Sequence, residues 1–191
     1  MKPLKRLLPL LPLGLVVTTV ATGLSSGLMP RPAAAQADSG GGLTIFGGVP
    51  AEYRLRYYTD FNTVRSTRAR YYLEVARTKV PRDVVILDVE FPESFTENGG
   101  RLNLDAIELR QGDWRGRDRI AIQSINLFEE ENRIEIIPAE PIPANTSFVV
   151  VMSNIRNPDR YGYHYFNLRM MYQGDVIDQY VGTWPMELGL N

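Results

Sequence analysis

The stretch RIEIIPAEPIPANTSFVVVMSNIRNPDRYGYHYFNLRMMY, residues 133–172, decides the fold class of this chain. It contains three runs rich in β-branched and aromatic residues, at residues 134–137, 147–152 and 163–172, and proline, asparagine and glycine separate them. Such runs, bounded by turn-forming residues, are typical of consecutive antiparallel strands. The stretch therefore predicts the core of an all-β domain.

The most regular strand pattern upstream of this stretch lies at residues 68–77. Tyr71 and Leu73 fall on one face of the expected strand, and Arg70 and Tyr72 fall on the other. A period of two is the pattern of a strand with one buried face. Further strands are expected at residues 53–57, 84–91, 120–128 and 176–181.

Several segments carry more detailed expectations. In residues 84–91 we expect Val85, Leu87 and Val89 to face the core. Residues 102–110 fit neither the helical nor the strand period, and they predict either a strand with an offset or one short helical turn. Three glutamates and Asn132, at residues 129–132, predict the turn that joins strands 120–128 and 133–137. Pro185 suits a final edge strand, because proline cannot donate to a sheet ladder.

About eight or nine short strands, with no convincing long helix, predict an antiparallel β-sandwich of the immunoglobulin-like or jelly-roll-like kind. A small up-and-down β-barrel is the alternative fold. We expect one sandwich domain at residues 51–191, preceded by a flexible leader at residues 38–50 that is rich in glycine. Residues 43–46 of the leader are a candidate short first strand.

The first 37 residues have the three parts of a secretory signal peptide. The segment begins with Lys2, Lys5 and Arg6, continues with an apolar run at residues 7–20, and ends in small residues that place cleavage after Ala35 or Ala37. The alternative is a retained membrane anchor, but the apolar run is shorter than the roughly 20 residues that span a bilayer. The sequence therefore predicts an exported chain, in the periplasm, cell envelope or medium, with no transmembrane segment after cleavage.

Composition excludes several classes of site. The chain has no cysteine, so a disulfide framework, a thiolate metal centre and a cysteine nucleophile are all excluded. It has one histidine, His164, so a metal site built on two histidines is also excluded. We expect no cofactor and no metal. Nucleic acid is an unsuitable partner, because the chain is acidic once the basic signal segment is removed.

Short motifs distributed along the chain resemble an uncharacterised family of exported domains known mainly from cyanobacteria, the domain of unknown function 2808. The motifs are Phe61-Asn62-Thr63-Val64-Arg65, residues 69–75 leading to Val80-Pro81, residues 141–146, and Asn157-Pro158 followed by residues 162–166. This chain has Pro143-Ala144 where that family often has Pro-Gly. The resemblance implies export and a β-fold, and it implies no catalytic residue because the family has no established activity.

The sequence gives little support for a catalytic function. Alternation places His164 on the same side of its strand as Phe166, which favours a structural, hydrogen-bonded histidine over a general base. Asp88 and Glu90 are two positions apart and therefore share a strand face, and Asp175 with Asp178 is a second candidate pair for the acid–base chemistry of a glycosidase. Such pairs are also common on solvated strand faces. We therefore expect a protein that is not an enzyme, with a carboxylate-dependent glycan hydrolase as an alternative.

Arginines and one tryptophan give the best binding candidates. Trp114 lies in a polar loop beside Arg115, Arg117 and Arg119, where an indole and guanidinium groups can contact an anionic partner. A tryptophan folded back over the sandwich edge is the alternative. Arg54, Arg56, Arg68 and Arg70 add a cationic patch if their strands share one face, unless they pair with acidic residues on neighbouring strands.

These features together predict a non-catalytic, exported module of the cell envelope. Its expected binding residues are Trp114, Arg115, Arg117, Arg119, Arg68 and Arg70. Its expected partner is an anionic polysaccharide or another envelope component. The alternative is a structural protein that contacts other envelope proteins through its sheet edges.

Overall fold

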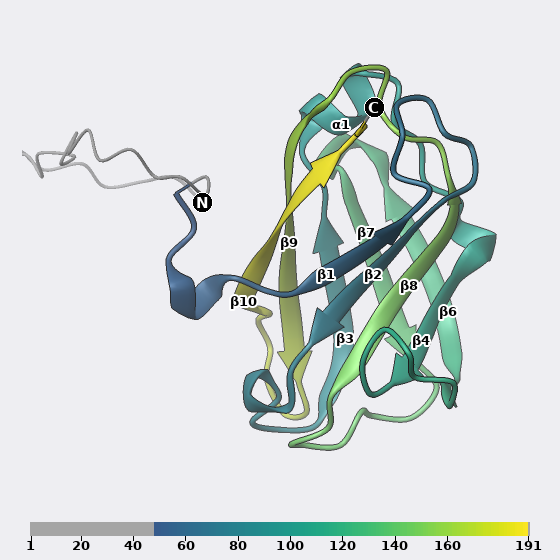
Figure 1. Cartoon of the computed structure of the whole chain (residues 1–191). Coiled ribbons are helices and arrows are strands. Elements are labelled where there is room, and N and C mark those ends of the chain that lie inside the picture. Colours follow the sequence, from purple (N-terminus) through teal and green to yellow (C-terminus); the bar gives the residue numbers. More distant parts are fainter. Residues whose placement is uncertain (1–47, 191) are drawn as a thin grey trace, which may run out of the picture. The chain divides into compact units, whose positions relative to one another are not determined.

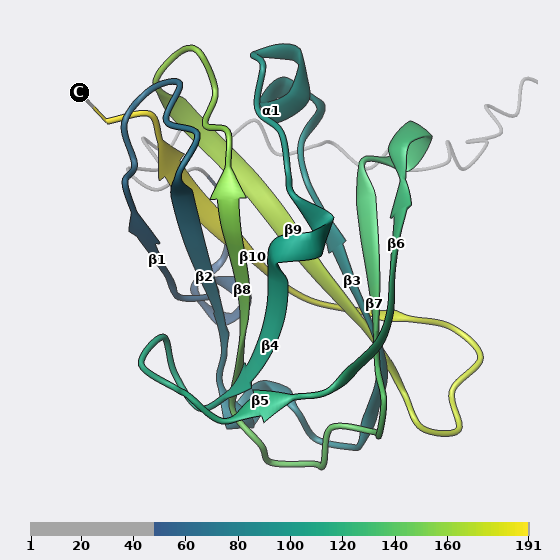
Figure 2. The same cartoon turned by 90° about the vertical axis from the view of Figure 1, so that its right-hand side faces the viewer.

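Two five-stranded antiparallel sheets make up the domain that the computed structural model describes, at residues 48–190 (Figure 1). Sheet A has the order β10-β9-β3-β7-β6, and sheet B has the order β1-β2-β8-β4-β5. Figure 2 shows β1, β2, β8 and β4 in one layer and β3, β7 and β6 in the other. The sheets are not closed into a barrel, so the predicted β-sandwich is confirmed.

The element bounds follow the expected strands closely. Sheet B consists of β1 (Tyr57–Asp60), β2 (Ala69–Val75), β8 (Phe148–Ile155), β4 (Ile107–Gln111) and β5 (Arg119–Ile120). Sheet A consists of β10 (Gln179–Leu188), β9 (Gly162–Tyr172), β3 (Val84–Glu90), β7 (Arg133–Pro138) and β6 (Ile122–Phe128). The short helices are α1 (Glu93–Glu97) and the 3₁₀ turns η1 (Ala51–Tyr53), η2 (Arg77–Lys79), η3 (Leu104–Ala106) and η4 (Glu129–Glu131).

Alternating apolar side chains from both sheets fill the space between the layers. In β2, Tyr71 and Leu73 are fully buried, as the sequence pattern predicts. Phe166 and Leu168 of β9 face them from sheet A and are equally buried. The rings of Tyr71 and Phe166 meet edge to face with centroids 6.3 Å apart, a favoured aromatic geometry that joins the two sheets.

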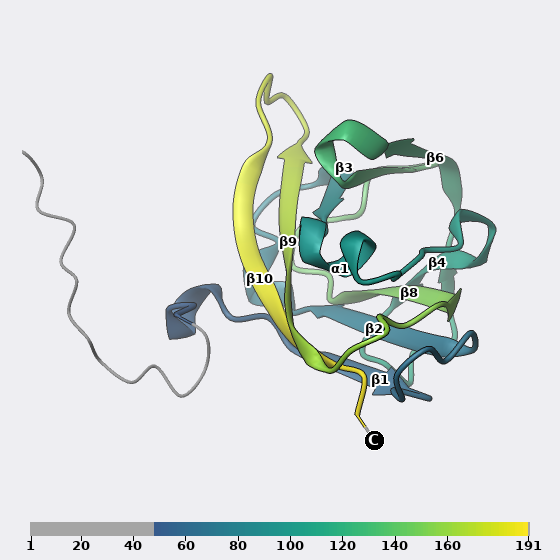
Figure 3. The same ribbon diagram turned by 90° about the horizontal axis from the view of Figure 1, so that it is seen from above.

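The helix α1 was not predicted from the sequence. Figure 3 shows α1 at one end of the sandwich, between the layers. Its Phe95 is fully buried and lies 5.5 Å from the ring centroid of Phe166. A Cβ on Gly100 would lie 2.6 Å from the carbonyl oxygen of Phe95, so glycine is required where the chain leaves the helix. A single buried aromatic residue therefore holds a helix too short to give a periodic signal.

Three strand predictions were partly wrong. Residues 53–57 do not form one strand, because η1 ends at Tyr53 and β1 begins only at Tyr57. In β3, Val84 is buried in place of Val85, since a register shift between residues 84 and 86 changes which side chains face the core. The last strand begins at Gln179 instead of residue 176, because ion pairs of Asp175 and Asp178 hold residues 173–178 in a loop.

Other expectations about the chain's organisation are confirmed. Residues 102–110 contain both a short helical turn, η3, and a strand, β4. Strands β6 and β7 pair antiparallel across the turn η4. Pro185 lies in β10, an edge strand. The predicted signal peptide and the candidate strand at residues 43–46 lie outside the described residues. No helix within residues 48–190 has the length and apolar character needed to cross a membrane.

His164 is buried against the helix α1 and is 4% exposed. Its ring meets that of Phe95 edge to face at 5.9 Å, and its Nδ1 lies 3.5 Å from Oγ of Ser94. Burial lowers the pKa of His164, because the interior disfavours the imidazolium. This environment suits the structural role that the sequence favoured.

The buried histidine is expected to make stability depend on pH. Because the folded-state pKa is lowered, the unfolded chain takes up the proton first as pH falls through about 6.5. The free energy of unfolding should therefore be retained above that pH and decline below it. Denaturant unfolding between about pH 7.5 and 5.5 would measure the slope, and His164→Gln should flatten it. An unchanged slope in this variant would assign the effect to another group.

Candidate functional site

The outer face of sheet B carries an aromatic and arginine-rich surface. Because Tyr71 and Leu73 of β2 point into the core, Tyr72 points outward. The antiparallel register places Tyr58 of β1 opposite Tyr72 on one side and Val151 of β8 opposite it on the other. Side chains directly opposite each other on neighbouring strands share a face, so these residues form one continuous surface.

Trp114 lies over this surface. Its ring stacks on that of Tyr58, with centroids 4.7 Å apart and 15° between the planes, and meets Tyr72 edge on at 6.3 Å. Beneath it, Val149 and Val151 are fully buried. We call these five residues the Trp114 cluster. Of the two predicted placements for Trp114, the structure shows the folded-back one, with the indole half-buried.

Glu74 holds the loop of residues 112–118 against the sheet. Its carboxylate accepts a hydrogen bond from the main-chain N–H of Trp114 at 3.0 Å and lies 3.8 Å from the guanidinium of Arg56. The Glu74 side chain is only 16% exposed, which strengthens a charge-assisted bond. A Cβ on Gly116 would lie 2.1 Å from the carbonyl oxygen of Gln111. The loop is therefore a closely packed turn with one anchored tryptophan.

The arginines beside this loop are engaged in two ways. The guanidinium carbon of Arg115 lies 4.7 Å from the ring centroid of Trp114, within the range of a cation–π interaction. Arg110 and Arg119 each approach Glu108 to 2.6 Å. Because two guanidinium groups share one carboxylate, this part of the face keeps a net positive charge. Among the four arginines for which cross-strand pairing was the alternative, Arg56 forms an ion pair with Glu74 of β2.

The other predicted arginines lie at the borders of the face. Arg70 donates a hydrogen bond to the hydroxyl oxygen of Tyr72 at 3.4 Å, and this bond is the main reason that the pKa of Arg70 is raised. Arg68 precedes β2, and its guanidinium carbon lies 5.4 Å from the ring centroid of Phe61. Arg117 is exposed, and within residues 48–190 it makes no ion pair.

The structure therefore brings four of the six predicted binding residues onto one face. These four are Trp114, Arg115, Arg119 and Arg70. Arg54 does not join the patch expected with Arg56, because it forms a parallel bridge with Thr183 of β10, in sheet A. Its guanidinium donates to the carbonyl oxygen of Val49 at 3.2 Å.

Two contributors were missed from the sequence. Tyr58 and Glu74 complete the face, and neither was a predicted binding residue. The strand alternation at residues 68–77 does place Glu74 on the same side as Arg70 and Tyr72. That pattern indicated its face, but it could not show that Glu74 meets a loop 40 positions further along the chain.

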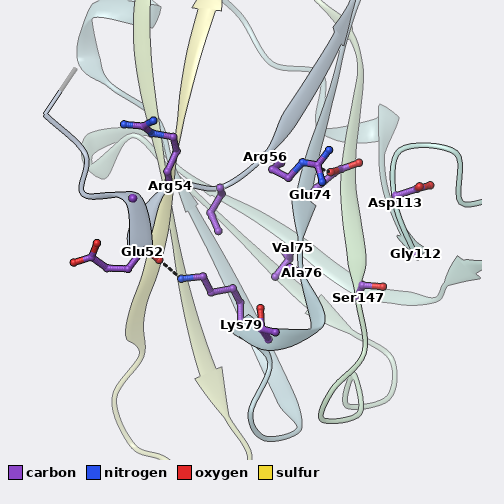
Figure 4. Close-up of a pocket in the computed structure, with 13 residues that line it drawn as sticks. Glu52, Arg54, Arg56, Glu74, Val75, Ala76, Lys79, Gly112, Asp113 and Ser147 are labelled. Atoms are coloured by element: carbon purple, nitrogen blue, oxygen red, sulfur yellow. Dashed lines mark hydrogen bonds and ion pairs between the residues drawn. The ribbon is translucent and has the colours of Figure 1, made fainter. Parts of the chain in front are cut away.

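A groove of about 390 Å³ adjoins the Trp114 cluster (Figure 4). It lies between residues 51–56, the end of β2 with η2, and the start of the loop of residues 112–118. Its charged lining residues are Glu52, Arg54, Arg56, Glu74, Lys79 and Asp113. The Nζ of Lys79 donates to the carbonyl oxygen of Glu52 across one side. Glu74 lines the groove and also accepts the hydrogen bond from the main-chain N–H of Trp114, so the groove and the Trp114 cluster are adjacent.

The carboxylate pairs proposed for catalysis lie elsewhere and are engaged by arginines. Arg82 contacts Asp175 with two hydrogen bonds of 2.6 Å, and Arg169 approaches Asp178 to 2.5 Å. These bonds lower the pKa values of both aspartates. Asp88 is 5% exposed and pairs with Arg133. Within residues 48–190, no three acidic or histidine side chains are arranged to hold a metal ion.

Comparison with known proteins finds one family. Residues 43–188 match the model of a family described as "Protein of unknown function (DUF2808)". A search of curated proteins gives no significant match.

Several solved structures with a similar fold are domains of bacterial surface and pilus proteins. The collagen-binding domain of a Staphylococcus aureus adhesin is 11% identical, with a TM-score of 0.42 over 70% of this chain and 95% of that one. ACE19, the collagen-binding subdomain of an Enterococcus faecalis surface protein, is 13% identical, with a TM-score of 0.40 over 69% and 96%. The group B streptococcus pilus 2b backbone protein is 16% identical, with a TM-score of 0.42 over 66% and 55%. The likeness is one of architecture.

Proposed function

This chain belongs to the DUF2808 family of proteins of unknown function, and from that premise we propose that it is an exported, non-catalytic module of the cell envelope. Its ligand in this proposal is an anionic polysaccharide. The binding surface is the outer face of sheet B, with Arg115, Arg119 and Arg70 as the cationic contacts.

The observation that carries this proposal is the fixed position of Arg115. Its guanidinium lies on Trp114, which stacks in turn on Tyr58, while Glu74 holds the main chain of the loop. A cation that is already ordered loses little conformational entropy when it binds. Guanidinium groups also match the planar, forked geometry of carboxylates and sulfates.

Tyr58 is the aromatic contact of this surface. It is 45% exposed and belongs to the same stack as the half-buried Trp114. A sugar ring can pack against the exposed part of such an aromatic side chain while nearby arginines bind its acidic groups. Trp114 acts in this proposal as the support of both Tyr58 and Arg115.

The environment of Asp175 and Asp178 argues against a glycosidase role for this pair. A glycosidase needs one carboxyl group that keeps its proton and a second one that is ionised. Both Asp175 and Asp178 have lowered pKa values because arginines bind them. Neither is therefore suited to donate a proton to a leaving group.

Dextran sulfate, with neutral dextran as the uncharged probe, would test the binding proposal. The exported protein should bind dextran sulfate and should not bind neutral dextran. Added salt should weaken the complex with dextran sulfate because the contacts are ionic. Arg115→Ala should raise the dissociation constant about tenfold, the effect of roughly 1.4 kcal/mol. Isothermal titration calorimetry at two salt concentrations would measure both effects.

Arg160→Ala is the matched control, because it removes the same charge from an exposed position outside the face of sheet B. Its dissociation constant should stay near that of the parent protein. Equal losses for Arg115→Ala and Arg160→Ala would mean that only net charge matters, and they would refute a site on sheet B. Failure of the parent protein to bind dextran sulfate at low salt would refute the proposal itself.

A further inference from the structure

The two sheets have four edge strands within residues 48–190, and three of them are protected against pairing with another chain. β1 has four residues and ends in Asp60, and β5 has only two residues. β10 contains Pro185, and its Thr183 accepts a main-chain hydrogen bond from Leu55 at 2.8 Å. Short length, charge, proline and covering segments are the usual devices that protect a sheet edge.

The fourth edge strand, β6, has few of these devices. Its seven residues, IQSINLF, include no charged residue and no proline. The sheet order within residues 48–190 gives it one neighbour, β7. The register is irregular only between Ile122 and Ser124, and from Ser124 to Phe128 it is continuous. Leu127 and Phe128 are 37% and 36% exposed. The free edge of this strand therefore offers its main-chain groups to a partner, and Leu127 and Phe128, on opposite faces of the strand, add apolar surface next to that edge.

The two ends of β6 carry opposite charges. Arg117 and Arg119 precede the strand together with a single acidic residue, Asp118, and the three glutamates of η4 follow it. The Arg119 side chain is 72% exposed and that of Glu131 is 60% exposed. Figure 2 shows β5 and η4 at opposite ends of β6. In an antiparallel pair of β6 strands, the basic end of one copy therefore lies beside the acidic end of the other.

We propose that β6 is a dimerisation edge, at which two copies of this chain pair antiparallel about a twofold axis and extend sheet A across both. A twofold axis places each residue near its own counterpart at the centre of the strand, and an uncharged strand permits this without repulsion. The charged ends make the edge complementary to itself, which favours a second copy over an unrelated extended peptide.

Substitutions that reverse the charge at one end of β6 test the proposal. Sedimentation equilibrium of the exported protein, without polysaccharide, should show a monomer–dimer equilibrium. Arg119→Glu alone places glutamates against glutamates, and Glu130→Arg alone places arginines against arginines. Each variant alone should have a dimer dissociation constant raised about tenfold or more. An equimolar mixture should form a heterodimer, because both of its end contacts are then attractive.

A second substitution tests the centre of the strand. Asn126→Lys brings two lysines together near the twofold axis and should also weaken the dimer. Gln173→Lys, in the exposed loop before β10, is the matched control and should leave the dimer unchanged. A parent protein that stays monomeric up to about 1 mM, where even weak pairing populates dimers, would overturn the proposal. A dimer that is insensitive to both Asn126→Lys and the charge-reversing substitutions would place the interface elsewhere.

Discussion

Trp184→Ala is expected to lower the free energy of unfolding by about 3–5 kcal/mol, the usual cost of removing a large aromatic side chain from a packed core. Trp184 is fully buried in β10 of sheet A. Its Nε1 donates a hydrogen bond to the carbonyl oxygen of Glu74, in β2 of sheet B, at 3.1 Å. The substitution therefore opens a cavity and also removes a polar contact between the two layers. Such a loss is a large part of the total stability of a typical domain, about 5–15 kcal/mol.

Urea unfolding followed by circular dichroism would measure this loss. The chain has two tryptophans, so Trp114→Ala is a control with the same chemical change at a half-buried position on the outer face. It should cost clearly less, because water already reaches part of that indole. Equal losses for the two variants would contradict the assignment of Trp184 as the side chain that ties the sheets together.

Arg133→Met is expected to destabilise the domain by about 3–5 kcal/mol near neutral pH, the usual result of leaving one charge of a buried ion pair without its partner. The Asp88 side chain is 7% exposed, and its carboxylate approaches the guanidinium of Arg133 to 2.5 Å. Burial raises the pKa of Asp88, while Arg133 acts in the opposite direction. Methionine keeps the apolar stem of Arg133 but removes the cation.

The sign of the pH dependence follows from this loss. Without Arg133 the folded-state pKa of Asp88 should rise further, so the folded chain binds a proton more tightly than the unfolded chain does. The destabilisation of Arg133→Met should then be largest above the folded-state pKa of Asp88 and should shrink as pH falls through it. Denaturant unfolding of the variant and of the parent protein over the acidic range would measure this change.

Two further variants make the test specific. Adding Asp88→Asn to Arg133→Met removes the unpaired charge and should recover part of the lost stability. Arg82→Met breaks the exposed pair with Asp175 and should have a much smaller effect, because water screens that pair. A double variant no more stable than Arg133→Met would show that the loss comes from packing and not from the buried carboxylate.

Much of the fold could be predicted because strand signals are local. The alternation in residues 68–77 predicted which side chains of β2 face the core, and the three runs in residues 133–172 correspond to β7, β8 and β9. It did not predict that Tyr72, on the outer face, is also buried. The errors occurred where a tertiary contact overrides the local period. A register shift put Val84 in the core in place of Val85, and a single buried side chain, Phe95, formed a helix of five residues.

The candidate site, too, could be predicted from the sequence only in part. Composition was enough to single out Trp114 and Arg115, because a tryptophan in a loop of arginines is an uncommon combination of residue types. It could not show that Glu74 anchors their loop or that Tyr58 stacks on the indole, since strands and a loop distant in sequence make these contacts.

The sequence by itself determined the layered β architecture, the buried faces of its strands and the residue types available for binding. Each of these depends on periodicity and composition within a few neighbouring residues. Only the tertiary structure decided which charges are paired, which side of Trp114 is covered and which strand edge stays open. These properties depend on strand order and register, which bring together residues far apart in the chain.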